Sequence, residues 1–153
     1  CGLHVHFDCR HIDREAYKVI AKRVWLSRMM LAATMPASRR ANKYCRLTNK
    51  FDTYSNDRYQ AVNMTAWSRY RTLEIRLHSS TIESTKILKW IQLLECIMNC
   101  VELDTRVQSL QGTALEHNLK LFKISTDDKA YWRERFAKFS GVDNACVEEE
   151  NVA

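Results

Sequence analysis

The stretch Thr72-Leu73-Glu74-Ile75-Arg76-Leu77 alternates strictly between polar and apolar residues. Successive side chains of a β-strand point to opposite faces, so this pattern predicts a half-buried strand. Leu73, Ile75 and Leu77 would face a core, while Thr72, Glu74 and Arg76 would lie on the other face. The stretch therefore predicts a sheet with one apolar face and one polar face.

Two other segments predict strands of the same sheet. Residues 3–7, Leu-His-Val-His-Phe, alternate in the same way, and residues 59–64 are rich in strand formers. We expect these two segments and 72–77 to form one antiparallel sheet. Asn63 would lie on the same face as Tyr59 and Ala61, so three strands would present five polar residues to one surface: His4, His6, Asn63, Glu74 and Arg76.

Helical periodicity marks the segments around the strands. Apolar residues recur at helical spacing from residue 13 to residue 35, and Pro36 ends that helix. The capping-box pattern at 80–83 predicts the start of a long helix, 81–104, and both helices would cover the apolar face. The second helix would bury one set of apolar residues: Ile87, Leu88, Ile91, Leu94, Met98 and Val101.

The remaining segments predict a loop and two further helices. The polar, basic residues 37–57 indicate a loop or lid. A second capping box at 113–116 opens a short helix, and the last helix covers about 127–139, with Gly141 in the C′ position. Without repeats or linkers, residues 1–141 are expected to form one α+β domain, followed by an acidic tail over 142–153.

Composition favours a globular chain of 153 residues that is 46% hydrophobic and 27% charged. No apolar run approaches the roughly 18 residues of a membrane span, and no signal-peptide pattern is present, so we expect a cytoplasmic protein. The six cysteines form no CxxC pair, which favours free thiols over a zinc site or a disulfide framework.

The formal charge of +6 comes from 24 basic and 18 acidic residues. The basic residues are scattered over 10–71, and no motif typical of nucleic-acid recognition accompanies them, so nucleic acid is not the expected partner. A pocket for a polyanionic small molecule such as ATP fits the charge better. Three glycines cannot build a Walker-type phosphate loop, so a sheet-borne site would have to hold the nucleotide.

The polar residues of the sheet have two interpretations each. His4 and His6 fit two solvent-facing histidines of an edge strand, or ligands of a metal or phosphate. Glu74 and Arg76 fit a surface ion pair that contributes little to stability. They also fit a carboxylate for a divalent cation beside a guanidinium for phosphoryl or carboxylate oxygens. Spacing alone leaves both interpretations open.

Several motifs follow one another in a fixed order: Cys1-Gly2-Leu3-His4-Val5-His6, Arg58-Tyr59-Gln60-Ala61-Val62-Asn63, Thr72-Leu73-Glu74-Ile75-Arg76-Leu77 and a following helix with Trp90-Ile91. This ordered set resembles the amidoligase family. The basic stretch 38–45 is similar to one that these proteins carry between the first two motifs. The resemblance covers residues 1–104. It implies the C-terminal half of a catalytic domain from the superfamily of glutamine synthetase and glutamate–cysteine ligase.

That resemblance implies an ATP-dependent carboxylate–amine ligase. ATP phosphorylates a carboxylate, an amine attacks the acyl phosphate, and an amide forms with release of ADP and phosphate. By position in the motifs, His4 and Glu74 match ligands of Mg²⁺ or Mn²⁺, His6 matches the histidine near the transferring phosphate, and Arg76 matches the arginine that grips phosphate or a substrate carboxylate. The ATP- or substrate-binding candidates are Arg40, Arg58 and Asn63, although both arginines also fit ordinary surface residues.

In this superfamily an earlier strand supplies paired glutamates for the metals, whereas the resemblance here starts at residue 1. Two hypotheses follow. The chain is the C-terminal part of a split or processed enzyme that needs a second polypeptide, or it is a catalytically inactive structural or interaction domain that retains the ligase fold. The presence of His4, His6, Glu74 and Arg76 together favours the enzyme.

Overall fold

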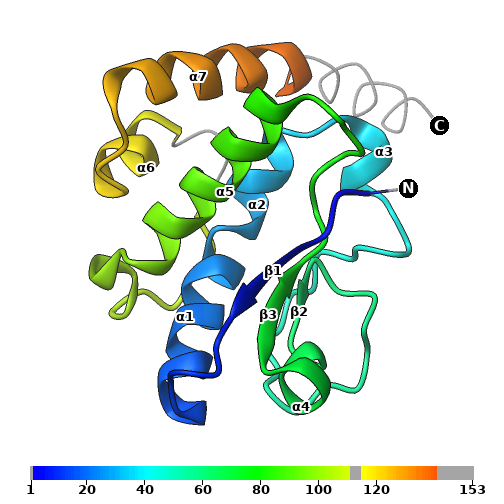
Figure 1. Ribbon diagram of the computed structural model, residues 1–153. Coiled ribbons are helices and arrows are strands. Elements are labelled where there is room, and N and C mark those ends of the chain that lie inside the picture. The colour runs from blue at the N-terminus through cyan, green and yellow to red at the C-terminus, as the bar shows by residue number, and fades with distance from the viewer. Residues whose placement is uncertain (1, 111–114, 141–153) are drawn as a thin grey trace, which may run out of the picture.

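A computed structural model describes residues 2–110 and 115–140. Its sheet has three antiparallel strands, β1 (Val5–Asp8), β2 (Val62–Asn63) and β3 (Thr72–Ile75), in the order β1-β3-β2 (Figure 1). Glu74 of β3 lies opposite His6 of β1 on one side and opposite Asn63 of β2 on the other. The predicted α+β class and the antiparallel sheet are confirmed.

The strand predicted at 59–64 is much shorter than expected. Gln60 forms a parallel bridge with Arg46, and the Arg46 N–H donates to the Tyr59 carbonyl at 2.7 Å. These bonds turn the first part of the segment toward residues 37–57 instead of β3. Those residues, predicted as a loop or lid, are therefore tied to the sheet edge, and they begin with a one-turn helix, α3 (Ala37–Arg40).

The single helix predicted at 13–35 is two helices, α1 (Arg14–Leu26) and α2 (Arg28–Ala33). Asp13 caps α1, because its Oδ1 accepts the Ala16 N–H at 2.8 Å. The break falls at Ser27, whose hydroxyl donates to the Arg23 carbonyl at 3.0 Å. Such a side-chain bond competes with the helical ladder and bends it, which the apolar periodicity alone could not reveal.

The capping box predicted at 80–83 is wrong. Helix α5 covers Ser84–Met98, its N-cap residue is Glu83, and no side chain caps it. Thr81 accepts the Glu83 N–H at 3.1 Å, so the polar residues form a turn before the helix. The extension to 104 is also wrong, because a short 3₁₀ helix, η1 (Val101–Leu103), follows α5.

The predicted core face of α5 is rotated about the helix axis. Of its six residues only Leu94 is buried, while Leu88 and Val101 are exposed. The side chains that α5 buries are Trp90, Leu93, Leu94 and Ile97. This face brings Trp90 against α7 (Thr126–Ser140), where its ring centroid lies 6.2 Å from that of Trp132.

Two more helices complete the described chain. Helix α4 (Ala66–Tyr70) connects β2 to β3 and lies at one end of the sheet, and α6 (Leu115–Leu121) precedes α7 (Figure 1). Helix α7 agrees with the helix predicted at about 127–139. The first residues of the box at 113–116, Gly141 and the tail 142–153 lie outside the described residues, as do Cys1 and Cys146.

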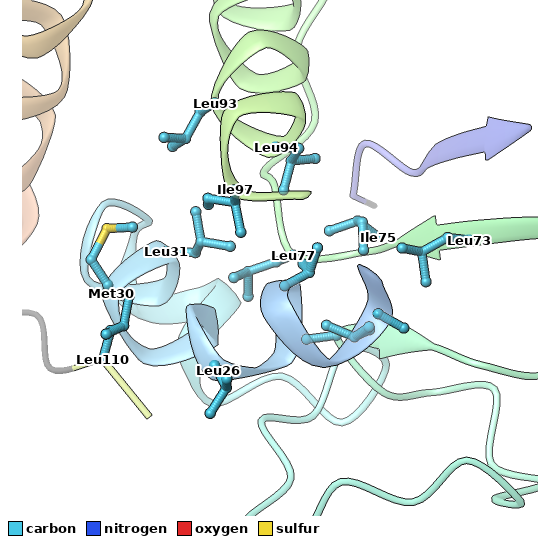
Figure 2. Packing of buried hydrophobic residues seen from close by; sticks show 14 of the residues in the cluster. Leu26, Met30, Leu31, Leu73, Ile75, Leu77, Leu93, Leu94, Ile97 and Leu110 are labelled. Carbon is cyan, nitrogen blue, oxygen red and sulfur yellow. The ribbon is translucent and has the colours of Figure 1, made fainter. Parts of the chain in front are cut away.

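The core lies between the apolar face of the sheet and the helices. Leu73, Ile75 and Leu77 lie along β3 and its continuation and belong to the same buried cluster as Leu94 and Ile97 of α5 (Figure 2). The cysteines that the structure describes are free thiols, as predicted: Cys9, Cys45, Cys96 and Cys100. None of the described helices combines the length and the apolar character that crossing a membrane requires.

Candidate functional site

Glu74 is the centre of the polar face of the sheet. Its Oε1 lies 3.0 Å from Arg76 Nη1, 3.1 Å from His4 Nδ1 and 3.6 Å from His6 Nε2. Its Oε2 accepts a hydrogen bond from Asn63 Nδ2 at 2.5 Å. Both carboxylate oxygens therefore have close donors, and the Glu74 side chain is only 8% exposed.

The strand register explains this convergence. His6 and Asn63 are the direct cross-strand neighbours of Glu74, and residues two apart on a strand share a face, which adds His4 and Arg76. Because Arg76 is also largely buried, with 13% of its side chain exposed, this is not the surface ion pair considered from the sequence. A buried carboxylate needs such partners, since desolvation penalises its charge.

Each partner of Glu74 is itself held in place. Asn63 Oδ1 accepts the N–H and the hydroxyl of Thr65 at 3.0 and 2.8 Å, which turns its amide NH₂ toward Glu74. His6 Nδ1 lies 3.0 Å from Thr72 Oγ1. Arg76 Nε donates to the Tyr44 carbonyl at 3.2 Å and so links the site to the 37–57 segment.

The surroundings of His4 favour its neutral form. Burial and the nearby Arg76 guanidinium lower the pKa of His4, with Glu74 acting in the opposite direction. His4 Nδ1 faces Glu74 Oε1 at 3.1 Å, and a neutral imidazole with its proton on Nδ1 keeps a lone pair on Nε2. His4 can therefore accept a proton or a hydrogen bond at that nitrogen.

A hollow of about 260 Å³ opens beside this cluster. It is bounded by β1, β2, β3, α4 and the residues before β2, and the chemically active residues in its lining are His6, Arg58, Asn63, Arg69, Glu74 and Arg76. Three guanidinium groups and one carboxylate give this lining a positive formal charge. It is suited to an anionic ligand.

A fourth arginine lies behind the cluster. Arg39 is only 6% exposed, and its guanidinium donates to the carbonyls of Arg76 and Leu77 at 2.5 and 3.2 Å. It packs so closely against Gly2 that a Cβ there would clash with the guanidinium. Arg39 thus fixes the backbone that carries Arg76 and adds a buried positive charge next to it.

Three larger hollows lie elsewhere on the described residues. One of about 460 Å³ borders the end of α5 and is lined by Cys96, Cys100, Glu102 and Asp128 among others, and one of about 410 Å³ lies between α7 and the residues before α5. Neither contains any of the residues singled out from the sequence motifs. The third, of about 360 Å³, is lined by residues of the 37–57 segment, including Arg40, and has no carboxylate in its lining. Size alone therefore does not choose between the hollows, and the chemistry of the Glu74 cluster makes the hollow beside it the candidate.

The structure brings most of the predicted site residues together. His4, His6, Asn63, Glu74 and Arg76 form the cluster, and Arg58 lines the same hollow. His4 does not line that hollow, and neither does Arg40, which lines the separate hollow of about 360 Å³. Arg40 Nη2 donates to the Phe139 carbonyl at the end of α7, at 2.8 Å.

Sequence reasoning named none of Arg39, Arg69, Tyr70 and Thr72 as a site residue, although it placed Thr72 on the polar face. Thr72 shares the polar face with Glu74 in the alternating stretch, so its contact with His6 could have been inferred from the register. Arg69 and Tyr70 belong to a segment that the sequence marks only as a connection. No motif signals their place in the lining.

The donor set does not fit a magnesium ion by itself. Magnesium prefers about six oxygen ligands, whereas only Glu74 offers carboxylate oxygens here and both already accept from other side chains. Among residues 2–110 and 115–140, no group of three or more His, Cys, Asp or Glu side chains is arranged to hold a metal. Glu74 lies 3.1 Å from His4 Nδ1, so its carboxylate is placed to fix the orientation of the His4 ring.

Comparison with known proteins gives one match. A family model described as "Putative amidoligase enzyme" matches residues 47–98, about a third of the chain. No curated protein and no solved structure matches. The matched range includes β2, α4, β3 and α5, with four of the site residues: Arg58, Asn63, Glu74 and Arg76. It supports the amidoligase family, over a shorter range than the 1–104 expected from the motifs.

Proposed function

We propose that this chain supplies the anion-binding part of the site of an ATP-dependent carboxylate–amine ligase. The observation that carries the proposal is the overlap of two independent features. The family match covers β2 and β3, and these strands hold the arginine-rich hollow beside Glu74. A ligase that forms an acyl phosphate must neutralise phosphoryl and carboxylate oxygens, which bidentate guanidinium groups do well.

In this proposal Arg76 and Arg58 bind oxygens of ATP or of the carboxylate substrate, and Glu74 holds Arg76 and His4 in position. His6, on the rim of the hollow, can exchange a proton with a bound group. Asn63 keeps the second oxygen of Glu74 occupied. Magnesium or manganese, expected from the resemblance, would need further oxygen ligands from the nucleotide and from carboxylates supplied by a second polypeptide.

The test compares two arginines in similar settings. Arg76 and Arg23 each pair with a carboxylate, with 13% and 12% of the side chain exposed, but only Arg76 lies at the hollow. ADP release is measured with ATP, magnesium, sets of candidate carboxylates and amines, and the second polypeptide that supplies the remaining carboxylates. We expect Arg76→Lys to lower the rate roughly a hundredfold, because a lysine cannot reproduce the bidentate contact, and Arg23→Lys to leave it unchanged. Equal rates for the wild type and Arg76→Lys would refute the assignment.

A second function has a specific observation in its favour. Glu74 is fully occupied by donors of this chain, as expected of a purely structural ion cluster. A catalytically inactive structural or interaction domain would keep the fold without turnover. It predicts no ADP release with any substrate set, and no binding of ATP to the hollow when Arg58 is monitored by NMR.

A further inference from the structure

The three arginines of the hollow differ in their partners. Arg76 is paired with Glu74. Arg58 contacts its neighbour Tyr59, with Nη2 donating to the hydroxyl at 3.1 Å and Cζ 5.0 Å from the ring centroid. Arg69 has its Cζ 5.1 Å from the centroid of the Tyr70 ring. Among residues 2–110 and 115–140, neither Arg58 nor Arg69 makes an ion pair with a carboxylate.

The lining therefore carries excess positive charge. Arg58, Arg69 and Arg76 face the single carboxylate of Glu74, so the formal charge of the lining is +2 with the histidine neutral. The buried Arg39 guanidinium behind the sheet end adds to the field, because the carbonyl oxygens to which it donates do not cancel its charge. Like charges in a confined space repel each other, and a bound anion of matching charge relieves that repulsion.

Helix α4 gives Arg69 a fixed place in the lining. Trp67 of α4 is 4% exposed and packs 4.4 Å from the ring of Tyr17 on α1. The helix ends at Arg71, which adopts the left-handed conformation with φ of 55° and whose N–H donates to the Trp67 carbonyl at 3.0 Å. This anchored turn holds Arg69 and Tyr70 at the rim, and Tyr70 also meets His6 edge-on at 6.3 Å.

We propose that the hollow binds a doubly charged oxyanion and that Arg69 determines its preference for two negative charges over one. Arg76 is already neutralised by Glu74, so Arg58 alone would match a monoanion, and Arg69 supplies the second unpaired positive charge. The inference rests on the proposed function for its place in the reaction, where the anion is a phosphoryl group or a substrate with two carboxylates.

The experiment measures binding of three small anions to the whole 153-residue chain at constant ionic strength and about pH 8, where inorganic phosphate is a dianion. Phosphate and succinate are the dianions, and acetate is the monoanion. The variants are Arg69→Gln and a matched control, Arg71→Gln, which removes the same charge two residues away. Arg71 is exposed, stacks on Trp67 at 4.8 Å and does not line the hollow.

We expect the wild type to bind at least one dianion about tenfold more tightly than acetate. Arg69→Gln should weaken the binding of that dianion about tenfold and have little effect on the binding of acetate, whereas Arg71→Gln should change neither affinity. Tighter binding of phosphate than succinate assigns the site to phosphoryl groups, and the reverse order assigns it to dicarboxylates. Equal affinity for acetate and both dianions, or equal weakening by the two variants, overturns the inference.

These results are separate from the test of the ligase. Anion binding needs neither ATP nor a second polypeptide. A chain that binds dianions through Arg69 but never releases ADP, even with the second polypeptide present, therefore retains this inference and loses the ligase function. A chain that releases ADP with an unchanged Michaelis constant in Arg69→Gln retains the ligase function and loses this inference.

Discussion

The two faces of β3 are buried by different means. On one face Leu73 and Ile75 are at most 1% exposed, beneath the helices, and on the other face Glu74 is 6% exposed, beneath polar side chains. Apolar burial is non-directional and is spread over many weak contacts. Burial of a carboxylate depends on a few directed donors. One alternating stretch thus forms two faces. The stability of one depends on the volume of its side chains, and that of the other depends on their charge.

The largest effect is expected on the apolar face. Ile75→Ala removes three buried carbons next to the helices that cover β3, and we expect a loss of about 3 kcal/mol in the free energy of unfolding. Urea denaturation followed by circular dichroism measures it. The control is Ile82→Ala, since Ile82 is 99% exposed and should contribute almost nothing. Similar losses in both variants would show that the core does not lie where β3 meets the helices.

A smaller effect is expected from Glu74→Gln, which keeps the volume and removes the charge. The glutamine presents an NH₂ group to a cluster of donors and leaves Arg76 without a carboxylate, so we expect a loss of about 2 kcal/mol. Urea denaturation at neutral pH measures this value. Activity of this variant must therefore be compared at equal folded fraction.

The control for Glu74→Gln is an exposed ion pair. Glu116 accepts two hydrogen bonds from Arg133 on the surface, with both side chains about half exposed. Glu116→Gln should leave stability unchanged, because water screens such a pair. If Glu74→Gln also leaves the free energy of unfolding unchanged, the polar face is solvated in solution, and the proposed difference between the two faces of β3 is wrong.

The sheet could be predicted because its signal is local. Alternation along 72–77 fixes which residues share a face, and this alone places Glu74 and Arg76 on one face. The same alternation along 3–7 places His4 and His6 on one face. The burial of Glu74 was not predictable in this way. It results from cross-strand neighbours such as Asn63, and the pairing register depends on contacts between segments that are distant in the chain.

The errors in the helices have physical causes. Apolar residues at helical spacing allow several faces of α5 to be buried, and the observed face brings Trp90 against Trp132, a contact between residues more than forty positions apart. The break at Ser27 depends on one hydroxyl bond. Arg69 lines the hollow because of where α4 lies, and no local pattern in the sequence encodes that placement.

A third prediction concerns pH and compares His4 with His78. Burial lowers the pKa of His78 to about 4 from 6.5, against an opposing bond of Nδ1 to the Ser79 carbonyl. Arg135, Arg39 and Lys86 lower it further. Since the folded pKa lies below the unfolded one, folding favours neutral His78. Its contribution to stability is complete above pH 6.5 and is lost as the pH falls toward 4.

We expect the protein to lose about 2 kcal/mol between about pH 7.5 and about pH 5 through this residue. Urea denaturation at both pH values measures the loss. In His78→Phe the ring is kept without the titrating group, so its pH dependence should be smaller by that amount. His4 also has a lowered pKa, but it is exposed and faces Glu74, so His4→Phe should change the pH dependence less. An identical pH dependence in the wild type and His78→Phe would contradict the assignment.

The smallest effect is expected at the rim of the polar face. Thr72→Val preserves the shape and the strand preference but removes the hydroxyl that lies 3.0 Å from His6 Nδ1. His6 is partly exposed and water can replace the lost partner, so stability should fall by only about 0.5 kcal/mol. The informative readout is the His6 ring. With the Thr72 hydroxyl removed, the NMR signals of His6 should show a change of tautomer or rotamer, while those of His4, held by Glu74, stay fixed. If both rings respond equally, the cluster around Glu74 moves as one unit, and the distinction between its buried centre and its solvated rim is lost.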